Sequence, residues 1–225
     1  WGFIRRSRSG LRWRSISSRP FWRGLGFSAG ECLAWPKGSG PLSRDRPWLI
    51  SVLGGECTGK TDLCEALGER LEAVRFEETL RAWVRAMGRP PRQGEQRALM
   101  EAQRAQELQA IEQAEERGCR LVLADSGPLM TAVYSMVYFG DDSLFQSAHR
   151  WQARYHLTLV CRDDLPWVPD PGQRDGEPFR ARAQSALREA LKSYPGDRVA
   201  EVSGQGEARV QLASHLIQGL NLGAR

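Results

Sequence analysis

The stretch from Gly54 to Thr61 constrains the fold of this 225-residue chain more than any other part of it. It reads "GGECTGKT", follows the apolar run "WLISVL", and precedes a segment with helical periodicity from Lys60 to Leu71. A continuous apolar run of this length is typical of a strand buried on both faces. Glycines allow the sharp backbone turn that must follow it. The sequence therefore predicts a strand, a tight turn and a helix inside an α/β domain.

The spacing of this stretch matches G-x-x-x-x-G-K-[ST], the Walker A or P-loop pattern. Backbone N–H groups of such a loop form an anion nest at the start of the following helix. Lys60 is expected to face solvent without nucleotide and to bind the β and γ phosphates with it, while the Thr61 hydroxyl is a suitable ligand for Mg²⁺. We therefore predict ATP and Mg²⁺ as cofactors. The predicted nucleotide-binding residues are Gly54, Gly55, Glu56, Cys57, Thr58, Gly59, Lys60, Thr61 and Asp62.

Strand-like and helix-like segments alternate from Trp48 onward. Further strands are predicted at 73–76, 119–125, 155–161 and 198–204. Helices are predicted at 78–87, 95–117, 128–138, 142–153, 179–192 and 207–220, with a proline-rich loop at 162–178. This alternation predicts crossover connections and a parallel sheet. The expected fold is a three-layer αβα P-loop NTPase with a mainly parallel, five-stranded sheet.

Residues 1–47 differ from the rest of the chain, because they lack any sustained apolar period. We expect a basic, disordered N-terminal extension followed by one P-loop domain at 48–225. An Arg- and Ser-rich leader resembles an organelle transit peptide. The alternative is a fragment or upstream extension that is not selected for folding.

The charge distribution and composition exclude several classes of function. The first 48 residues contribute +8 to a net charge of +5, so the remaining 177 residues carry −3. We therefore expect no nucleic-acid partner. No run reaches the roughly 18 apolar residues of a membrane span, so no membrane partner is expected. The five cysteines form no CxxC pair, which favours reduced thiols and a cytoplasmic location.

Three further positions carry candidate catalytic groups. Asp125 ends the strand-like "RLVLAD" and is a candidate Mg²⁺ ligand together with Thr61, although an acid there could instead cap a helix. Glu78 follows the second predicted strand and is a candidate base for the acceptor hydroxyl, with Arg81 one turn away; a solvated ion pair is the alternative. Arg174 lies in the proline-rich loop and could stabilise the charge of phosphoryl transfer, or belong to a plain surface loop.

Together these motifs resemble the NadR-type, ribosylnicotinamide kinase-like family. The resemblance covers about residues 48–220, in consistent order. It rests on "LGGECTGKTDL", Glu78-x-x-Arg81, Gln103, "LADSGPLMTAVYSMVYFGDDSL", "LTLVCRDDLPWVPDPGQRDG" and "VSGQGEAR". It implies phosphorylation of the 5′-hydroxyl of nicotinamide riboside by MgATP. Lys60, Thr61 and Asp125 would then serve ATP and the metal, and Glu78, Arg81 and Gln103 the nucleoside acceptor.

The chain departs from that family at two places. Where the family has an aromatic residue before the glutamate, this chain has Glu77, and where the family has a second aspartate after the strand, it has Gly127. Both departures fall on the acceptor side. The leading hypothesis is a small-molecule kinase of NAD metabolism, and the alternative is a P-loop ATPase that acts as a regulatory or binding module. The oligomeric state is left open.

Overall fold

β1 lies in the centre of a five-stranded parallel sheet whose strand order is β2-β3-β1-β4-β5. The computed structural model describes residues 46–168, 176–192, 194 and 198–220. The strands are β1 (Trp48–Leu53), β2 (Val74–Phe76), β3 (Leu121–Asp125), β4 (Leu157–Cys161) and β5 (Val199–Val202). Because all pairs are parallel, the carboxyl ends of the strands meet at one edge of the sheet, where α/β proteins place their ligands.

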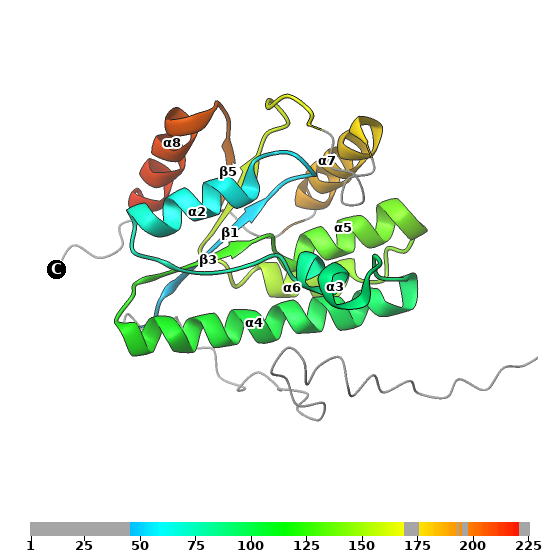
Figure 1. Ribbon diagram of the computed structural model, residues 1–225, viewed down its shortest axis with the longest axis horizontal. Helices are drawn as coiled ribbons and strands as arrows, with labels where there is room; N and C mark the ends of the chain where they lie inside the picture. The colour runs from blue at the N-terminus through cyan, green and yellow to red at the C-terminus, as the bar shows by residue number, and fades with distance from the viewer. Residues whose placement is uncertain (1–45, 169–175, 193, 195–197, 221–225) are drawn as a thin grey trace, which may run out of the picture. The chain divides into compact units, whose positions relative to one another are not determined.

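Helices cover both faces of this sheet (Figure 1). They are α2 (Lys60–Arg70), α3 (Thr79–Met87), α4 (Gln96–Arg117), α5 (Pro128–Phe139), α6 (Phe145–Gln152), α7 (Glu177–Lys192) and α8 (Gly206–Gln218). A single 3-10 turn, Gln93–Glu95, precedes α4. Among the described residues, no helix is long and apolar enough to cross a bilayer.

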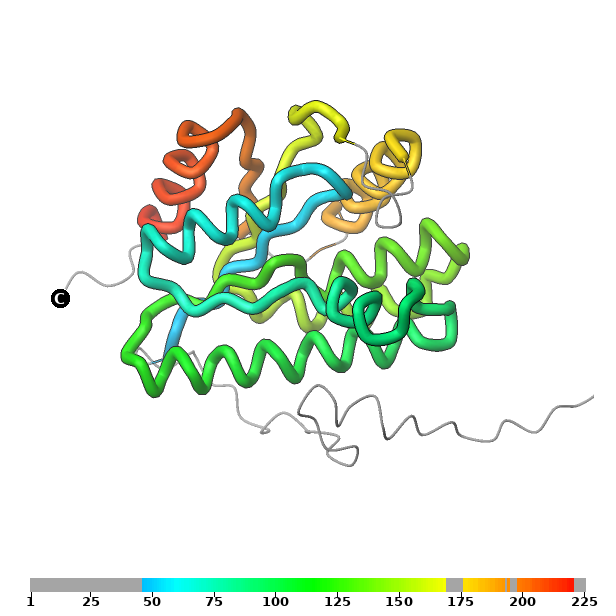
Figure 2. The backbone as a smooth tube through the Cα atoms, viewed as in Figure 1, coloured from blue at the N-terminus to red at the C-terminus, as the bar shows by residue number. Residues whose placement is uncertain are grey.

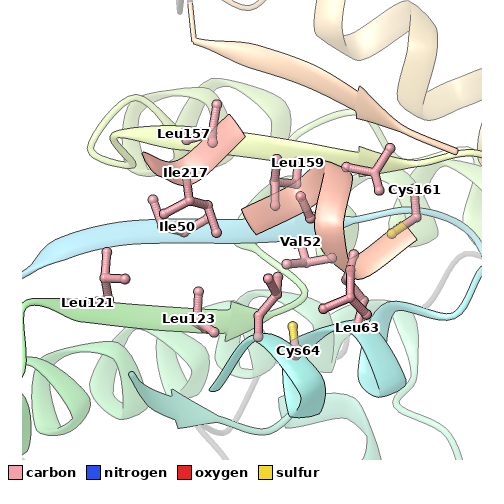
Figure 3. Packing of buried hydrophobic residues seen from close by; sticks show 14 residues of the cluster. Ile50, Val52, Leu63, Cys64, Leu121, Leu123, Leu157, Leu159, Cys161 and Ile217 are labelled. Carbon is pink, nitrogen blue, oxygen red and sulfur yellow. The ribbon is translucent and has the colours of Figure 1, made fainter. Parts of the chain in front are cut away.

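Successive residues of β1 contribute to different core clusters, which explains why the sequence of this strand is apolar throughout. Ile50 and Val52 pack against α2 and α8 in a cluster that also contains Leu63 and Ile217 (Figure 3). Leu53 belongs to a second cluster, with residues of α4, α5, α6 and α7. A strand between two helical layers has no solvent-exposed face and therefore no polar alternation.

The structure confirms the predicted α/β architecture with its five parallel strands. The predicted elements are all present among the described residues, with ends that differ by a few residues. The largest difference is α6, which was predicted from residue 142 and begins at Phe145. There Asp141 accepts a hydrogen bond from the Ser143 N–H (3.0 Å), a local turn that competes with helix formation. Residues 1–45 lie outside the described residues, so the domain boundary at 47/48 stays a prediction.

Candidate active site

The turn between β1 and α2 depends on its glycines for space and conformation. A Cβ atom at Gly54 would lie 2.6 Å from the Thr58 hydroxyl and 3.1 Å from the Cys161 carbonyl. Gly59 has a φ of 73°, in the left-handed region that favours glycine. The chain can therefore make this turn only with very small residues at these two positions.

Hydrogen bonds inside the turn converge on one carbonyl. The Thr58 hydroxyl and the Lys60 ammonium both donate to the Gly55 carbonyl, at 2.8 and 2.9 Å. Lys60 is only 8% exposed. The prediction that it faces solvent is wrong, because a buried ammonium needs an acceptor and the loop carbonyl supplies one. A bound phosphate would compete with this carbonyl for the lysine.

A side chain from α7 supports the turn from outside. Gln184 accepts a hydrogen bond from the Gly55 N–H (2.9 Å) and donates to the Cys161 carbonyl (3.0 Å). Figure 2 shows the turn after β1 lying beside α7. Gln184 was not among the predicted site residues. Its signal was a polar residue on the apolar stripe of α7, between Ala183 and Leu187, where a buried amide must find partners.

Asp125 lies next to the turn because β3 pairs with β1, in a register that places it opposite Val52. Its Oδ2 accepts a hydrogen bond from the Thr61 hydroxyl (2.7 Å). Its Oδ1 is buried and has no hydrogen-bond partner among the described residues. Gly127 caps α5, so the alternative role of Asp125 as the cap does not hold.

The oxygens at this point fit Mg²⁺. The ion prefers oxygen ligands and keeps several waters or phosphate oxygens in its shell. Within the described part of the chain, no group of three or more His, Cys, Asp or Glu could hold a metal by itself. A Mg²⁺ ion at Thr61 and Asp125 would therefore take its remaining ligands from nucleotide phosphates and water, and the unsatisfied Oδ1 is a suitable contact.

Glu78 stands at the end of β2 and is the N-cap residue of α3. Its side chain is 13% exposed and lies 3.4 Å from the Arg81 guanidinium. Burial is the main cause that raises the pKa of Glu78; the charge of Lys60 lowers this pKa, that of Asp125 raises it, and the charge and hydrogen bond of Arg81 lower it. The carboxyl group is therefore mostly withdrawn from water and lies within electrostatic reach of the nucleotide turn. The alternative, an i,i+3 ion pair with Arg81, is also present, with its arginine half-exposed and its carboxyl group only 13% exposed.

Gln103 and Tyr134 lie on α4 and α5, and Tyr134 is within electrostatic reach of Glu78. Gln103 is 4% exposed on α4 and accepts a hydrogen bond from the Thr131 hydroxyl of α5 (3.4 Å). Burial raises the pKa of Tyr134, and the charges of Glu78 and Glu56 act in the same direction. Tyr134 was not predicted as a site residue, although it belongs to the T-x-x-Y part of the motif that carried the family resemblance.

The structure shows the surroundings of the two departures from the family pattern. A Cβ atom at Gly127 would lie 2.6 Å from the Gln152 Oε1 atom. Gln152 is fully buried and donates to the hydroxyls of Ser51 (2.6 Å) and Thr158 (2.9 Å), so it is held in this position. Glu77, by contrast, points to solvent and pairs with Arg85 at 2.8 Å.

Most of the predicted site residues come together at the carboxyl edge of the sheet. Asp62 and Cys57 do not join them in this way. Asp62 is exposed on the first turn of α2. The Cys57 sulfur accepts a hydrogen bond from the Val168 N–H (3.3 Å) and so contacts the loop after β4. Arg174 lies outside the described residues.

The sequence matches the AAA domain family over residues 49–209. No curated protein matches the chain. Among solved structures, NadR protein in complex with NAD and AMP-PNP is similar, with a TM-score of 0.61 and 18% identity over 81% of this chain and 51% of that one. NadR protein in complex with NR is also similar, with a TM-score of 0.61 and 20% identity over 81% and 52%.

A thymidylate kinase from Ehrlichia chaffeensis is similar over 78% of this chain and 99% of its own, with a TM-score of 0.55 and 17% identity. This chain spans about half of the length of the NadR chains that it matches. Identities this low establish the fold alone. They confirm the P-loop αβα fold and, at the level of the fold, the likeness to NadR.

Proposed function

Because this chain belongs to the AAA domain family and has a P-loop kinase fold, we propose that it is a MgATP-dependent kinase for a nucleoside-type small molecule. The γ-phosphate of ATP is transferred to a hydroxyl of the acceptor, and nicotinamide riboside is the first acceptor to test. The likeness to NadR bound to NR supports this choice of acceptor.

The donor nucleotide is held by the turn between β1 and α2. Backbone N–H groups of such a turn and the start of α2 attract phosphate oxygens. Lys60 leaves the Gly55 carbonyl for the β and γ phosphates, and Thr61 with Asp125 holds Mg²⁺. A Mg²⁺ ion held there would neutralise charge on the phosphates.

The observation that carries the proposal is the carboxyl group of Glu78, which is only 13% exposed and lies within electrostatic reach of Lys60 and Asp125. A carboxylate whose pKa is raised toward neutrality accepts a proton more readily from a hydroxyl. Glu78 is therefore the proposed base, and Arg81 and Gln103 position the acceptor. Arg174 is proposed to stabilise charge on the transferred phosphoryl group.

The experiment is an acceptor screen with MgATP that measures ADP release and phosphorylated product together. Nicotinamide riboside, the common ribonucleosides and the common deoxyribonucleosides are offered separately. We expect ADP release to rise with one acceptor and to equal the amount of its phosphorylated product. The Lys60→Ala variant controls for contaminating kinases.

Two outcomes would contradict the kinase proposal. ADP release that is independent of every acceptor would favour the ATPase module. Absence of both nucleotide binding and ADP release would remove the assignment of the P-loop as a nucleotide site.

A further inference from the structure

Arg209 is a buried arginine on α8, 4% exposed, whose guanidinium contacts three separate segments at the carboxyl edge of the sheet. It donates to the carbonyl of Thr58 in the nucleotide turn at 3.1 Å. It also donates to the Arg162 carbonyl and the Asp164 carboxylate after β4, at 3.1 and 2.9 Å. It also donates to the Gly204 carbonyl after β5, at 2.6 Å.

The contact with Thr58 fixes the orientation of one peptide in the nucleotide turn. The first carbonyl of α2 that accepts a helical hydrogen bond is that of Gly59, from Leu63. The Thr58 carbonyl therefore lies outside the helix, and since Thr58 is fully buried, this carbonyl needs another donor. In a planar trans peptide, the N–H points opposite to the C=O. When Arg209 holds the Thr58 carbonyl, the Gly59 N–H must point to the other side of the turn.

A second set of bonds holds Arg209 in place. Asp164 accepts from the guanidinium with one carboxylate oxygen and from the Gly204 N–H with the other, at 2.9 and 2.7 Å. The loop after β4, the turn after β5 and the nucleotide turn are thus joined through one side chain. An arginine can do this because its planar guanidinium presents several donors in fixed directions, whereas a lysine cannot.

We propose that Arg209 is a positioning residue that orients the Thr58–Gly59 peptide so that the Gly59 N–H is presented to the nucleotide phosphates. The inference rests on the proposed function only in requiring that the turn binds a nucleotide. Arg209 does not itself contact the substrate. Its effect on affinity passes through the backbone of the turn.

A purely structural role for Arg209 makes a different prediction, and α8 offers a matched control. Glu207 on the same helix pairs with Arg70 of α2 at 2.7 Å, with both side chains largely exposed. This pair joins α8 to α2 without contacting the nucleotide turn. If Arg209 only anchored α8, any loss of MgADP affinity would be proportional to the loss of thermal stability. This would hold equally for variants at Arg209 and at Glu207.

The experiment compares Arg209→Lys, Asp164→Asn and Glu207→Gln in the full chain. Affinity for MgADP is measured by calorimetry, and the Gly59 amide is followed without nucleotide in protein labelled with ¹⁵N-glycine. We expect Arg209→Lys to weaken MgADP binding at least about tenfold and to shift the Gly59 amide resonance. Both changes should be larger than any loss of thermal stability in this variant explains. Asp164→Asn should give a smaller loss in the same direction, and Glu207→Gln should stay within twofold of wild type.

A folded Arg209→Lys protein with wild-type MgADP affinity and an unmoved Gly59 resonance would overturn the proposal. If Arg209→Lys does not fold, Asp164→Asn decides by the same two measurements, since it keeps the arginine and removes one of its anchors. If the wild-type protein binds MgADP but phosphorylates no acceptor, only the kinase proposal is overturned. The MgADP affinities of the variants still test the proposal for Arg209.

Discussion

The two sides of the candidate site are built in different ways. The proposed donor side consists of Gly54–Thr61 and Asp125, and its turn is closed by contacts between residues a few positions apart, such as Thr58 and Lys60 with the Gly55 carbonyl. The proposed acceptor side consists of Glu78, Arg81, Gln103 and Tyr134, which come from α3, its N-cap, α4 and α5. A site made by backbone conformation can be read from local spacing, whereas a site assembled from several helices depends on how they pack.

The departures from the family pattern follow the same division. The donor side keeps every residue of the Walker A spacing. The changes at Glu77 and Gly127 both fall on the acceptor side, and the second is compensated by Gln152, which fills the space beside Gly127. A nucleotide as the phosphate donor can therefore be inferred from the motif, whereas the identity of the acceptor has to be found by experiment.

The largest expected effect is on the donor side. Lys60→Ala should abolish ATP-dependent activity, because the lysine charge acts on the phosphates both in binding and in the transition state. The fold should remain, since Gly55 keeps its bond from Thr58. Kinase assays with circular dichroism test this, and Lys192→Ala, an exposed lysine paired with Glu189, is the control. Unchanged nucleotide affinity and turnover would disprove the P-loop assignment.

On the acceptor side, Glu78→Gln should lower kcat on the order of 10²–10⁴-fold, because a general base acts mainly in the transition state. Nucleotide affinity should change little. The matched control is Glu77→Gln, since Glu77 is the exposed neighbour that pairs with Arg85. If Glu78→Gln turns over as fast as wild type with its best acceptor, the acceptor side proposed above must be abandoned, while the donor side would stand.

Asp125→Asn tests the proposed role of Asp125 as a Mg²⁺ ligand. The substitution removes the charge beside Thr61 and should weaken apparent Mg²⁺ affinity on the order of 10- to 100-fold, with a parallel fall in kcat. Titration of activity with Mg²⁺ measures both, and Asp163→Asn, at an exposed pair with Arg188, is the control. A variant with the Mg²⁺ dependence of wild type would show that Asp125 does not serve the metal.

Gly127→Ala tests whether Gln152 explains the missing aspartate. The added Cβ would meet the fully buried Gln152 side chain and Leu53, at 2.6 and 3.0 Å. Overpacking of this kind costs about 1–3 kcal/mol of unfolding free energy. Gly94→Ala is the control, since a Cβ there has no described atom within 4 Å. Equal urea midpoints for the two variants would mean that residue 127 is free to change and that its glycine needs another explanation.

The sequence predicted the order of elements and the donor side because both depend on local signals. Apolar runs gave the strands, and glycine spacing gave the nucleotide turn. Gln184 and Arg209 were not predicted, because they approach the turn from α7 and α8, 129 residues from Gly55 and 151 residues from Thr58. The strand order brings these helices to the turn. In the sequence, Gln184 was indicated only as a polar residue on an apolar stripe, whereas Arg209 also ends the segment "VSGQGEAR" of the family resemblance. The buried position of Lys60 was not predicted, because it depends on the Gly55 carbonyl, which accepts the ammonium group only in the folded turn.

The smallest expected effect is on thermal stability. It tests whether Glu78 serves the proposed reaction or stabilises the fold. Burial raises its pKa above the ordinary value of 4.5. A carboxyl group shifted in this direction favours folding where it is protonated, and that contribution is lost as the pH rises through the folded-state pKa. As the pH rises from 4 to 7 this contribution falls, so Glu78→Gln should gain melting temperature relative to wild type; a gain of about 4 °C would correspond to roughly 1 kcal/mol. At pH 4 glutamine resembles the protonated acid, so the difference from wild type should shrink. Melting curves of both proteins at the two pH values measure this, and a variant that is less stable than wild type at pH 7 but not at pH 4 would show that the carboxylate is kept for its ion pair with Arg81.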